Sequence, residues 1–452
     1  MASIKSEELL HYVWKHRLFP LGDLRTTDGK SVEVIQPGLQ NHNSGPDFFN
    51  AQLKIDGQTW VGNVEIHLQS SDWFRHHHDT DSAYNNVVLH VVGKADIDIP
   101  YPDDESHNIP QLELPVPEMV VRRYEELVQS DIIPRCRAIL PNEPKLTIHN
   151  WLSALQIERL EEKTAKIKER LEQCEHSWED VFFRTLARNF GFGVNGDAFE
   201  LWANTIPPSA MGKHRDSLFQ IESLFFGTAG MLNDATEEKL THLRQNGAEI
   251  NESIDYFMSL KKEFAFLRCK FSIIPMNSKI FKFGRLHPQN FPTIRIAQLA
   301  KLYYEGRINL SRIIYAETIK DIYSLLETDV SPFWQTHYHF SSDPSAESER
   351  KLSDSSKDLI IINSIVPLLF AYGKYRGDDK LQDRALNLLE QLKPEKNRII
   401  ANWEEAGVKC HNAGDSQALL QLTHNYCEVH DCLRCRFGYE YIKQTPTFLN
   451  ED

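Results

Sequence analysis

Hydrophobic positions in the N-terminal part of the chain mostly alternate with polar ones, a period of two that predicts β-strands. The predicted elements are a helix at 4–15, strands at 32–35, 47–55, 59–69 and 87–92, a short helix at 71–84, and edge strands at 96–99 and 111–114. Asp56-Gly57 is a hairpin-turn signal between two of these strands. The order helix, three strands, helix, strand indicates a small α/β sandwich.

Beyond residue 118 the hydrophobic spacing becomes helical. Helices are predicted at 118–129, 147–174, 177–190, 214–226, 235–248, 251–268, 293–304, 355–373, 378–392, 397–406 and 416–428, with a polar loop at 341–356. We therefore expect an α+β protein that is mostly α. Its predicted parts are an α/β domain at 1–130, a linker at 131–145 and a large irregular α-helical domain at 146–452.

The composition is that of a soluble globular protein, with 41% apolar and 25% charged residues over 452 positions. The formal net charge of −14 argues against an extended nucleic-acid surface. Seven cysteines in this length do not indicate a disulfide framework. The N-terminus has no apolar secretory core, and no apolar run reaches the roughly 18 residues that span a bilayer. A cytoplasmic protein without a membrane segment is expected.

Two acids on neighbouring predicted strands form the main candidate site. Asp47, in Gly45-Pro46-Asp47, opens one strand, and Glu65 lies two positions before His67 on the next. Carboxylates so placed can share a hard divalent cation, which polarises a phosphate and lowers the pKa of a bound water. Because side chains two apart on a strand share a face, His67 would stand beside Glu65 on a polar face.

The site can form only if the register of this hairpin brings Asp47 and Glu65 to the same face. A two-residue turn at Asp56-Gly57 pairs Ile55 with Gln58, which sets Asp47 opposite Ile66, on the wrong face for Glu65. A one-residue bulge or a longer turn would bring Asp47 opposite Glu65 or His67. We predict that the carboxylates of Asp47 and Glu65 lie within reach of one ion.

The order of elements, with Asp47 opening the second strand and Glu65-Ile66-His67 in the third, resembles the PD-(D/E)XK nuclease superfamily. The resemblance implies a sandwich of that type and a Mg²⁺- or Mn²⁺-dependent phosphodiesterase, with Asp47 and Glu65 at its acidic positions. His67 stands where that superfamily usually has Lys, and Glu7 or Glu8 could match a helical Glu of some members. The whole chain also resembles a large bacterial family of unknown function.

The histidine-rich segment 76–78 is similar to the His-x-His-x-Asp motif of metallo-β-lactamase-type hydrolases, but Thr80 occupies the Asp position. On a helix, Asp72 and His76 are neighbours four positions apart. A solvated, salt-bridged helix face is therefore favoured over metal ligation here. His90 is expected to be a hydrogen-bonded histidine of the core or a strand edge.

The C-terminal cysteines give a second candidate metal site. Cys427, Cys432 and Cys435 have the spacing Cys-x4-Cys-x2-Cys, and Cys410 can complete four thiolates. Such a set suits zinc or an iron–sulfur cluster. His411, His424 and His430 are alternative fourth ligands, and reduced, packed cysteines are the alternative to a metal site.

Residues 261–320 are rich in Lys and Arg, with interspersed phenylalanines. Cations attract phosphate backbones and exposed aromatic rings stack on bases, so nucleic acid is a candidate partner. The predicted nucleic-acid-binding residues are Lys279, Lys282, Arg285 and Arg295. The alternative is that the phenylalanines are core and the cations form a solvated face.

These patterns favour metal-dependent hydrolysis of phosphodiester bonds in nucleic acid, with Asp47, Glu65 and His67 as catalytic residues. The first alternative is a non-catalytic module that binds nucleic acid or protein on a degenerate nuclease fold. The second is a metal hydrolase that acts on another substrate.

Overall fold

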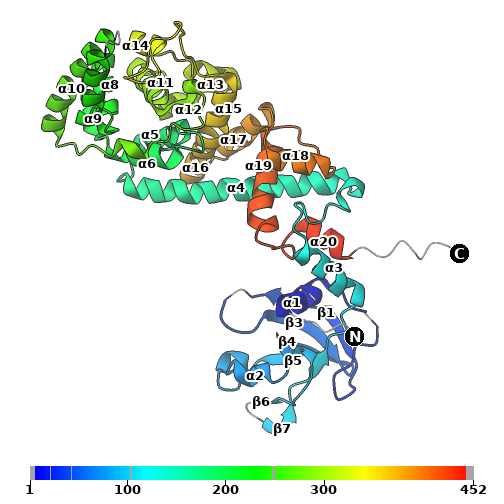
Figure 1. Cartoon of the computed structure of the whole chain (residues 1–452). Coiled ribbons are helices and arrows are strands. Elements are labelled where there is room, and N and C mark those ends of the chain that lie inside the picture. Colours follow the sequence, from blue (N-terminus) through cyan, green and yellow to red (C-terminus); the bar gives the residue numbers. More distant parts are fainter. Residues whose placement is uncertain (1–5, 21, 42, 102–103, 247–249, 444–452) are drawn as a thin grey trace. The chain divides into compact units, whose positions relative to one another are not determined.

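The computed structural model describes residues 6–20, 22–41, 43–101, 104–246 and 250–443 (Figure 1). The chain forms two compact units. Unit 1 is made of Met1–Trp151, Ala401–Lys409 and Leu422–Asp452, and unit 2 of Leu152–Ile400 and Cys410–Gln421. The N-terminal unit thus differs from the predicted domain in containing the C-terminal cysteine segment. It does so because the C-terminal helix α20 packs on α3, which directly follows the sheet.

Unit 1 is built on a mixed sheet with the strand order β1-β3-β4-β5-β8, and β2 pairs with β3. The strands are β1 Val32–Gln36, β2 Leu39–Gln40, β3 Phe48–Ile55, β4 Gln58–Gln69, β5 Val87–Lys94 and β8 Gln111–Glu113. Neighbouring strands from β1 to β4 are antiparallel, whereas β4, β5 and β8 run parallel. Residues 96–99 do not form the predicted edge strand; a separate hairpin of β6 (Pro100–Tyr101) and β7 (Asp104–Asn108) follows them.

The helices of unit 1 are α1 Glu7–His16, α2 Asp72–Arg75, α3 Glu118–Gln129 and α20 Arg436–Lys443, together with most of α18 Arg398–Glu405. Helix α1 begins where the Ser6 hydroxyl accepts the backbone N–H of Leu9. Its buried face includes Leu10 and Trp14, and both α1 and α2 pack against β4. Six consecutive residues of β4, Gly62 to His67, are therefore buried, including the polar side chains that the sequence places on an open face.

A β-bulge in β3 sets the register that the candidate site requires. The turn pairs Ile55 with Gln58, as predicted, and the ladder continues to Ala51 opposite Gly62. It then shifts by one residue, so that Phe48 lies opposite Val64. Asn50 takes the left-handed conformation, with φ of 53°, and its backbone N–H donates to Asn63 Oδ1. Of the two predicted alternatives, a bulge or a longer turn, the structure has the bulge, which turns Asp47 toward Glu65.

Unit 2 is helical and has one large apolar core. Its helices are most of α4 (Lys145–Gln173), α5 Trp178–Phe190, α6 Gly196–Thr205, α7 Pro208–Lys213, α8 Leu218–Thr228, α9 Asp234–Gln245, α10 Asn251–Phe271, α11 Pro292–Glu305, α12 Leu310–Tyr315, α13 Ile319–Leu325, α14 Pro332–Thr336, α15 Asp354–Ile360, α16 Val366–Arg376, α17 Asp379–Gln391 and most of α19 (Ala413–Leu422). The long predicted helices are confirmed, and the short ones from α12 to α14 are additions.

Among the described residues, one helical stretch, Asp354–Arg376, is long and apolar enough to cross a membrane. Of its most apolar window, 78% is buried inside the protein, as in a core helix of a soluble protein.

The bulge yields a prediction for stability and site geometry. A β-branched residue tolerates the left-handed conformation poorly, so Asn50→Val should cost about 1–2 kcal/mol of folding free energy, whereas Asn50→Gly should cost little. Urea unfolding of the full chain measures both variants. Equal stability of the two would contradict the left-handed bulge.

Candidate metal centre in the N-terminal sheet

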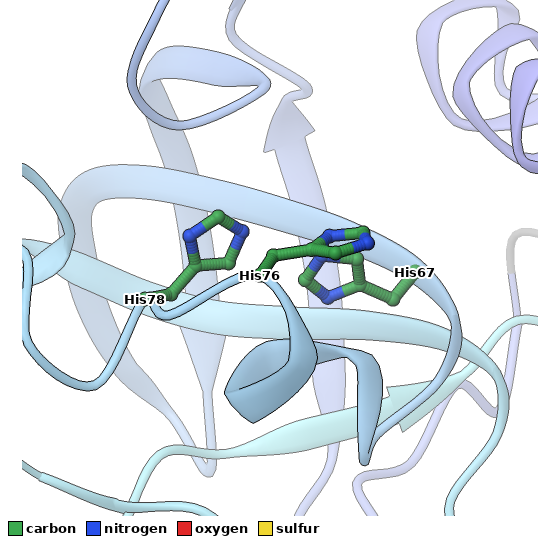
Figure 2. Close-up of side chains that lie close together, drawn as sticks. All are labelled: His67, His76 and His78. Carbon is green, nitrogen blue, oxygen red and sulfur yellow. The ribbon is translucent and has the colours of Figure 1, made fainter.

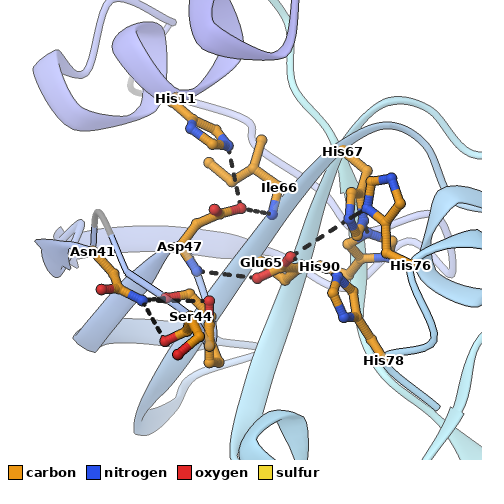
Figure 3. A network of polar contacts seen from close by, with 12 residues as sticks. His11, Asn41, Ser44, Asp47, Glu65, Ile66, His67, His76, His78 and His90 are labelled. Atoms are coloured by element: carbon orange, nitrogen blue, oxygen red, sulfur yellow. Dashed lines mark hydrogen bonds and ion pairs between the residues drawn. The ribbon is translucent and has the colours of Figure 1, made fainter. Parts of the chain in front are cut away.

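The side chains of Asp47 and Glu65 each accept a hydrogen bond from the backbone of the neighbouring segment that carries the other acid (Figure 3). The backbone N–H of Asp47 donates to Glu65 Oε2 at 3.0 Å, and the backbone N–H of Ile66 donates to Asp47 Oδ2 at 2.9 Å. The preceding loop is fixed as well, because the backbone N–H of Asn41 donates to the Asp47 carbonyl at 2.7 Å. Two carboxylates are therefore fixed side by side. The Asp47 side chain keeps 22% of its exposure, whereas that of Glu65 keeps 5%.

Three imidazoles, those of His67, His76 and His78, gather beside one another (Figure 2). His67 projects from β4, and His76 and His78 come from the turn after α2. One ring nitrogen of each lies within 4.8 Å of the others. The segment is not the predicted solvated helix face, because α2 ends at Arg75 and His77 adopts a left-handed φ of 61°. His76 and His78 thereby meet His67 (Figure 2). His78 is buried, whereas His76 and His77 are exposed.

The Glu65 carboxylate connects the two groups. Its Oε1 lies 3.1 Å from His78 Nε2 and 3.5 Å from His67 Nε2, and His67 Nε2 lies 3.1 Å from His76 Nδ1. Neighbouring ligands of an octahedral ion with bonds of about 2.1 Å are about 3 Å apart. The spacing of these atoms therefore fits coordination of one divalent ion after small side-chain movements.

Burial favours the neutral forms of Glu65, His67 and His90 in the absence of a cation. The pKa of Glu65 is raised to about 9, first by burial and next by the Asp47 carboxylate. Burial and the neighbouring histidines lower the pKa of His67 to about 2, and burial lowers the pKa of His90 to about 3. Neutral imidazoles offer the free lone pair that a metal ion needs, and a cation would restore the charged form of Glu65.

His90 of β5 supports His67 from behind. Its Nε2 lies 2.9 Å from His67 Nδ1, and its own Nδ1 has no hydrogen-bond partner although it is buried. The expectation of a hydrogen-bonded core histidine is thus met at one ring nitrogen only. In the tautomer in which His67 Nδ1–H donates to His90, the His67 Nε2 lone pair points to the cluster. His90 is therefore suited to orienting His67 as a ligand.

Helix α1 adds His11, which sequence reasoning missed. His11 Nε2 lies 3.2 Å from Asp47 Oδ2. Burial alone would lower the pKa of His11, but the hydrogen bond to Asp47 and the charges of Asp47, Glu7 and Glu65 raise it above its ordinary value. Glu7 and His11 are four positions apart on one helix, and this spacing was the available sequence signal.

A groove in unit 1 reaches the site at His11 and Asn41 and has a volume of about 1140 Å³. Its other walls include α1 and the segment between Tyr426 and Tyr439. The cationic and aromatic lining residues are Lys15, Arg434 and Arg436 and Tyr12, Tyr124, Trp151, Tyr426 and Tyr439. Two acids, Glu8 and Asp431, also line it.

The other predicted site residues divide between the two units. Cys427, Cys432 and Cys435 are buried in unit 1, whereas Cys410 belongs to unit 2 and its thiol bonds to the Asn412 carbonyl at 3.7 Å. The structure therefore does not bring the four predicted thiolate ligands together in one unit.

The basic residues of unit 2 also differ in their surroundings. Lys279, Lys282 and Arg285 are exposed. Arg295 is buried under Phe192, and its guanidinium donates to Gln298, Asn290 and Ser356. The burial of Arg295 and the internal acceptors of its guanidinium argue against the predicted contact with nucleic acid.

Comparison with known proteins places the chain in a family. A family model described as "Protein of unknown function (DUF2851)" matches residues 7–398, and the chain belongs to this family. The match includes Asp47, Glu65 and the three imidazoles but not the C-terminal cysteines. No curated protein and no solved structure matches the chain. The resemblance to the PD-(D/E)XK superfamily thus stays a prediction.

The imidazole cluster predicts which histidines bind metal. His76→Asn should weaken Mn²⁺ or Zn²⁺ binding by about tenfold or more, because it removes one ligand. The neighbouring exposed substitution His77→Asn should leave the affinity unchanged, since Asn also tolerates a left-handed backbone. Isothermal titration calorimetry compares the two variants. Equal effects of the two would remove the cluster as a metal site.

The raised pKa of Glu65 predicts how the folding stability depends on pH when a chelator has removed metal ions. Its pKa rises from 4.5 in the unfolded chain to about 9 in the fold, so above pH 4.5 the folded state keeps a proton that the unfolded chain has lost. This group therefore destabilises the fold progressively as the pH rises from about 4.5 to about 9. Glu65→Gln stays neutral, so it should be more stable than the wild type at pH 8 and similar near pH 4. Urea unfolding in EDTA that shows no such gain at pH 8 would contradict the shifted pKa.

Proposed function

We propose that unit 1 hydrolyses phosphodiester bonds of nucleic acid with a divalent metal ion bound at Asp47, Glu65 and His67. The observation that carries this proposal is the bulge at Asn50, which sets Asp47 beside Glu65 next to three imidazoles. The element order α1, β1, β3, β4, α2, β5, with one acid before β3 and one in β4, also supports it. It is the arrangement expected from the resemblance to PD-(D/E)XK nucleases.

The donor set favours Mn²⁺ over Mg²⁺. Mg²⁺ binds oxygen ligands almost exclusively, whereas Mn²⁺ accepts carboxylates and also imidazole nitrogen. Glu65 and His67 would hold the ion, with His76 and His78 as further imidazole ligands, and Asp47 would complete the set on the more exposed side. When bound, such an ion polarises the phosphate and activates a water.

His11, and not His67, is the residue that can stabilise negative charge in this site. His67 occupies the position of the usual Lys, but its lowered pKa keeps it neutral, so it acts as a ligand and brings no positive charge. The hydrogen bond to Asp47 raises the pKa of His11 above its ordinary value and so favours its protonated form. We assign to His11 the stabilisation of charge that develops on the phosphate, or protonation of the leaving oxygen.

The groove beside the site suits a single strand of nucleic acid. Lys15, Arg434 and Arg436 can attract its phosphates, and tyrosine and tryptophan rings can stack on its bases. Because the groove borders His11, a strand bound there would bring a phosphodiester close to Asp47.

A binding module without hydrolysis is the second candidate, and the burial of Glu65 favours it. Glu65 is 4% exposed, which restricts the access of a phosphate to an ion held there. Such a module would bind nucleic acid in the groove independently of Glu65.

The decisive comparison is between two acids of unit 1, Asp47 and Asp79. Asp47→Ala should lower Mn²⁺-dependent cleavage of single-stranded DNA or RNA by about 100-fold or more, because it removes several kcal/mol of metal-assisted stabilisation. The matched control Asp79→Ala, an exposed acid outside the cluster, should cleave normally. Gel assays with labelled oligonucleotides measure both.

Binding of the oligonucleotide by the wild type without cleavage in Mg²⁺, Mn²⁺ or Zn²⁺ would contradict hydrolysis and support the binding module. Cleavage that Asp47→Ala leaves intact would exclude this site as its source.

A further inference from the structure

The C-terminal segment of unit 1 gathers four buried thiols, and one of them is unexpected. Cys427, Cys432 and Cys435 lie within nine positions of sequence, whereas Cys136 comes from the turn after α3. All four are 5–6% exposed and none forms a disulfide. The thiols of Cys427, Cys432 and Cys435 all act electrostatically on Cys136, so the four share one small region.

We propose that Cys136, Cys427, Cys432 and Cys435 form a four-thiolate centre that binds a thiophilic metal, as one zinc ion or as an iron–sulfur cluster. Cys136 takes the place that sequence spacing gave to Cys410. The proposal is independent of hydrolysis at Glu65.

Backbone N–H groups lie next to these thiols. Those of Phe437 and Gly438 are close to the Cys435 thiol, and that of Arg135 is close to the Cys427 thiol. Backbone N–H groups beside sulfur stabilise thiolates in metal centres. The Arg135 guanidinium adds a positive charge beside Cys427 and Cys432.

The backbone around the thiols is tightly packed and hydrogen-bonded. The N–H of Cys435 donates to the Cys432 carbonyl at 3.3 Å, which closes a turn between the two cysteines. Gly438 lies so close to this turn that a Cβ on it would be 2.0 Å from the Cys432 carbonyl oxygen. Arg135 Nε donates to the Cys427 carbonyl at 2.9 Å and ties this segment to the residue before Cys136.

The spacing of the thiols favours an iron–sulfur cluster over a single zinc ion. Four thiolates around one zinc ion, with bonds of about 2.3 Å, stand about 3.8 Å apart. Among the residues that the structure describes, only the imidazole trio brings three such ligand atoms within 4.8 Å of one another. The thiols are therefore spaced more widely than zinc ligands, as a multi-iron cluster would require.

This centre would fix the C-terminal segment against α3 and so form one wall of the groove. Cys435 itself lines the groove, with His430 and Tyr439 nearby. His430 Nδ1 lies 3.1 Å from the Val128 carbonyl oxygen at the end of α3, which makes the same connection without metal.

The test is metal analysis of the full chain purified without oxygen. The wild type should contain either iron with equimolar sulfide or about one zinc per chain. Cys136→Ser should lower that metal content by about tenfold or more. Cys410→Ser is the matched control and should retain it, whereas the sequence-based ligand set requires its loss.

A second measurement covers the case in which Cys136→Ser does not fold. The wild type is treated with alkylating reagent before and after chelation, and modified cysteines are mapped by mass spectrometry. Metal removal should expose Cys136 together with Cys427, Cys432 and Cys435, and leave Cys410 unaffected. Wild-type protein without stoichiometric iron or zinc, or chelation that exposes Cys410 instead of Cys136, would overturn the proposal.

Discussion

The buried carboxyl group of Glu65 is the feature on which the candidate site depends. It accepts the backbone N–H of Asp47 with one oxygen and meets the rings of His67 and His78 with the other. A carboxylate removed from water needs a compensating charge or a proton, and the fold supplies no cationic side chain in contact with it among the described residues. A divalent ion would provide that charge and would also use the lone pairs of the neutral imidazoles. We therefore propose that metal binding offsets the electrostatic cost of burying this carboxyl group.

The chemistry of their ligands distinguishes the two proposed metal sites. The centre at Glu65 mixes carboxylate and imidazole, which suits ions such as Mn²⁺ that hydrolytic sites use. The four-thiolate centre is soft, buried and surrounded by backbone donors, which suits a structural role. Unit 1 would then hold one reactive metal beside the groove and one that shapes its wall. The groove connects them physically, because His11 and Cys435 both line it.

The sequence was most informative where local rules decide the structure. The strand alternation and the Asp56-Gly57 turn predicted the hairpin. The conflict in register between Asp47 and Glu65 predicted a bulge or a longer turn, because register follows from a period of two. Contacts between distant segments were not accessible in this way. His11 joins Asp47 through packing of α1 on the sheet, and Cys136 meets residues some 300 positions away through packing of α3 on α20. Arg295 was expected at the surface because it is a cation, but it lies in the core. Hydrophobic periodicity carries no information about the internal acceptors to which its guanidinium donates.

The location of bound Mn²⁺ tests the central claim most directly. Crystals of the full chain grown with Mn²⁺ should show an anomalous scattering peak in coordination contact with Glu65 Oε1 and at least one ring nitrogen of His67, His76 or His78. Crystals in which Mn²⁺ is bound elsewhere, or in which Glu65 remains hydrogen-bonded as in the metal-free fold at saturating Mn²⁺, would contradict the account.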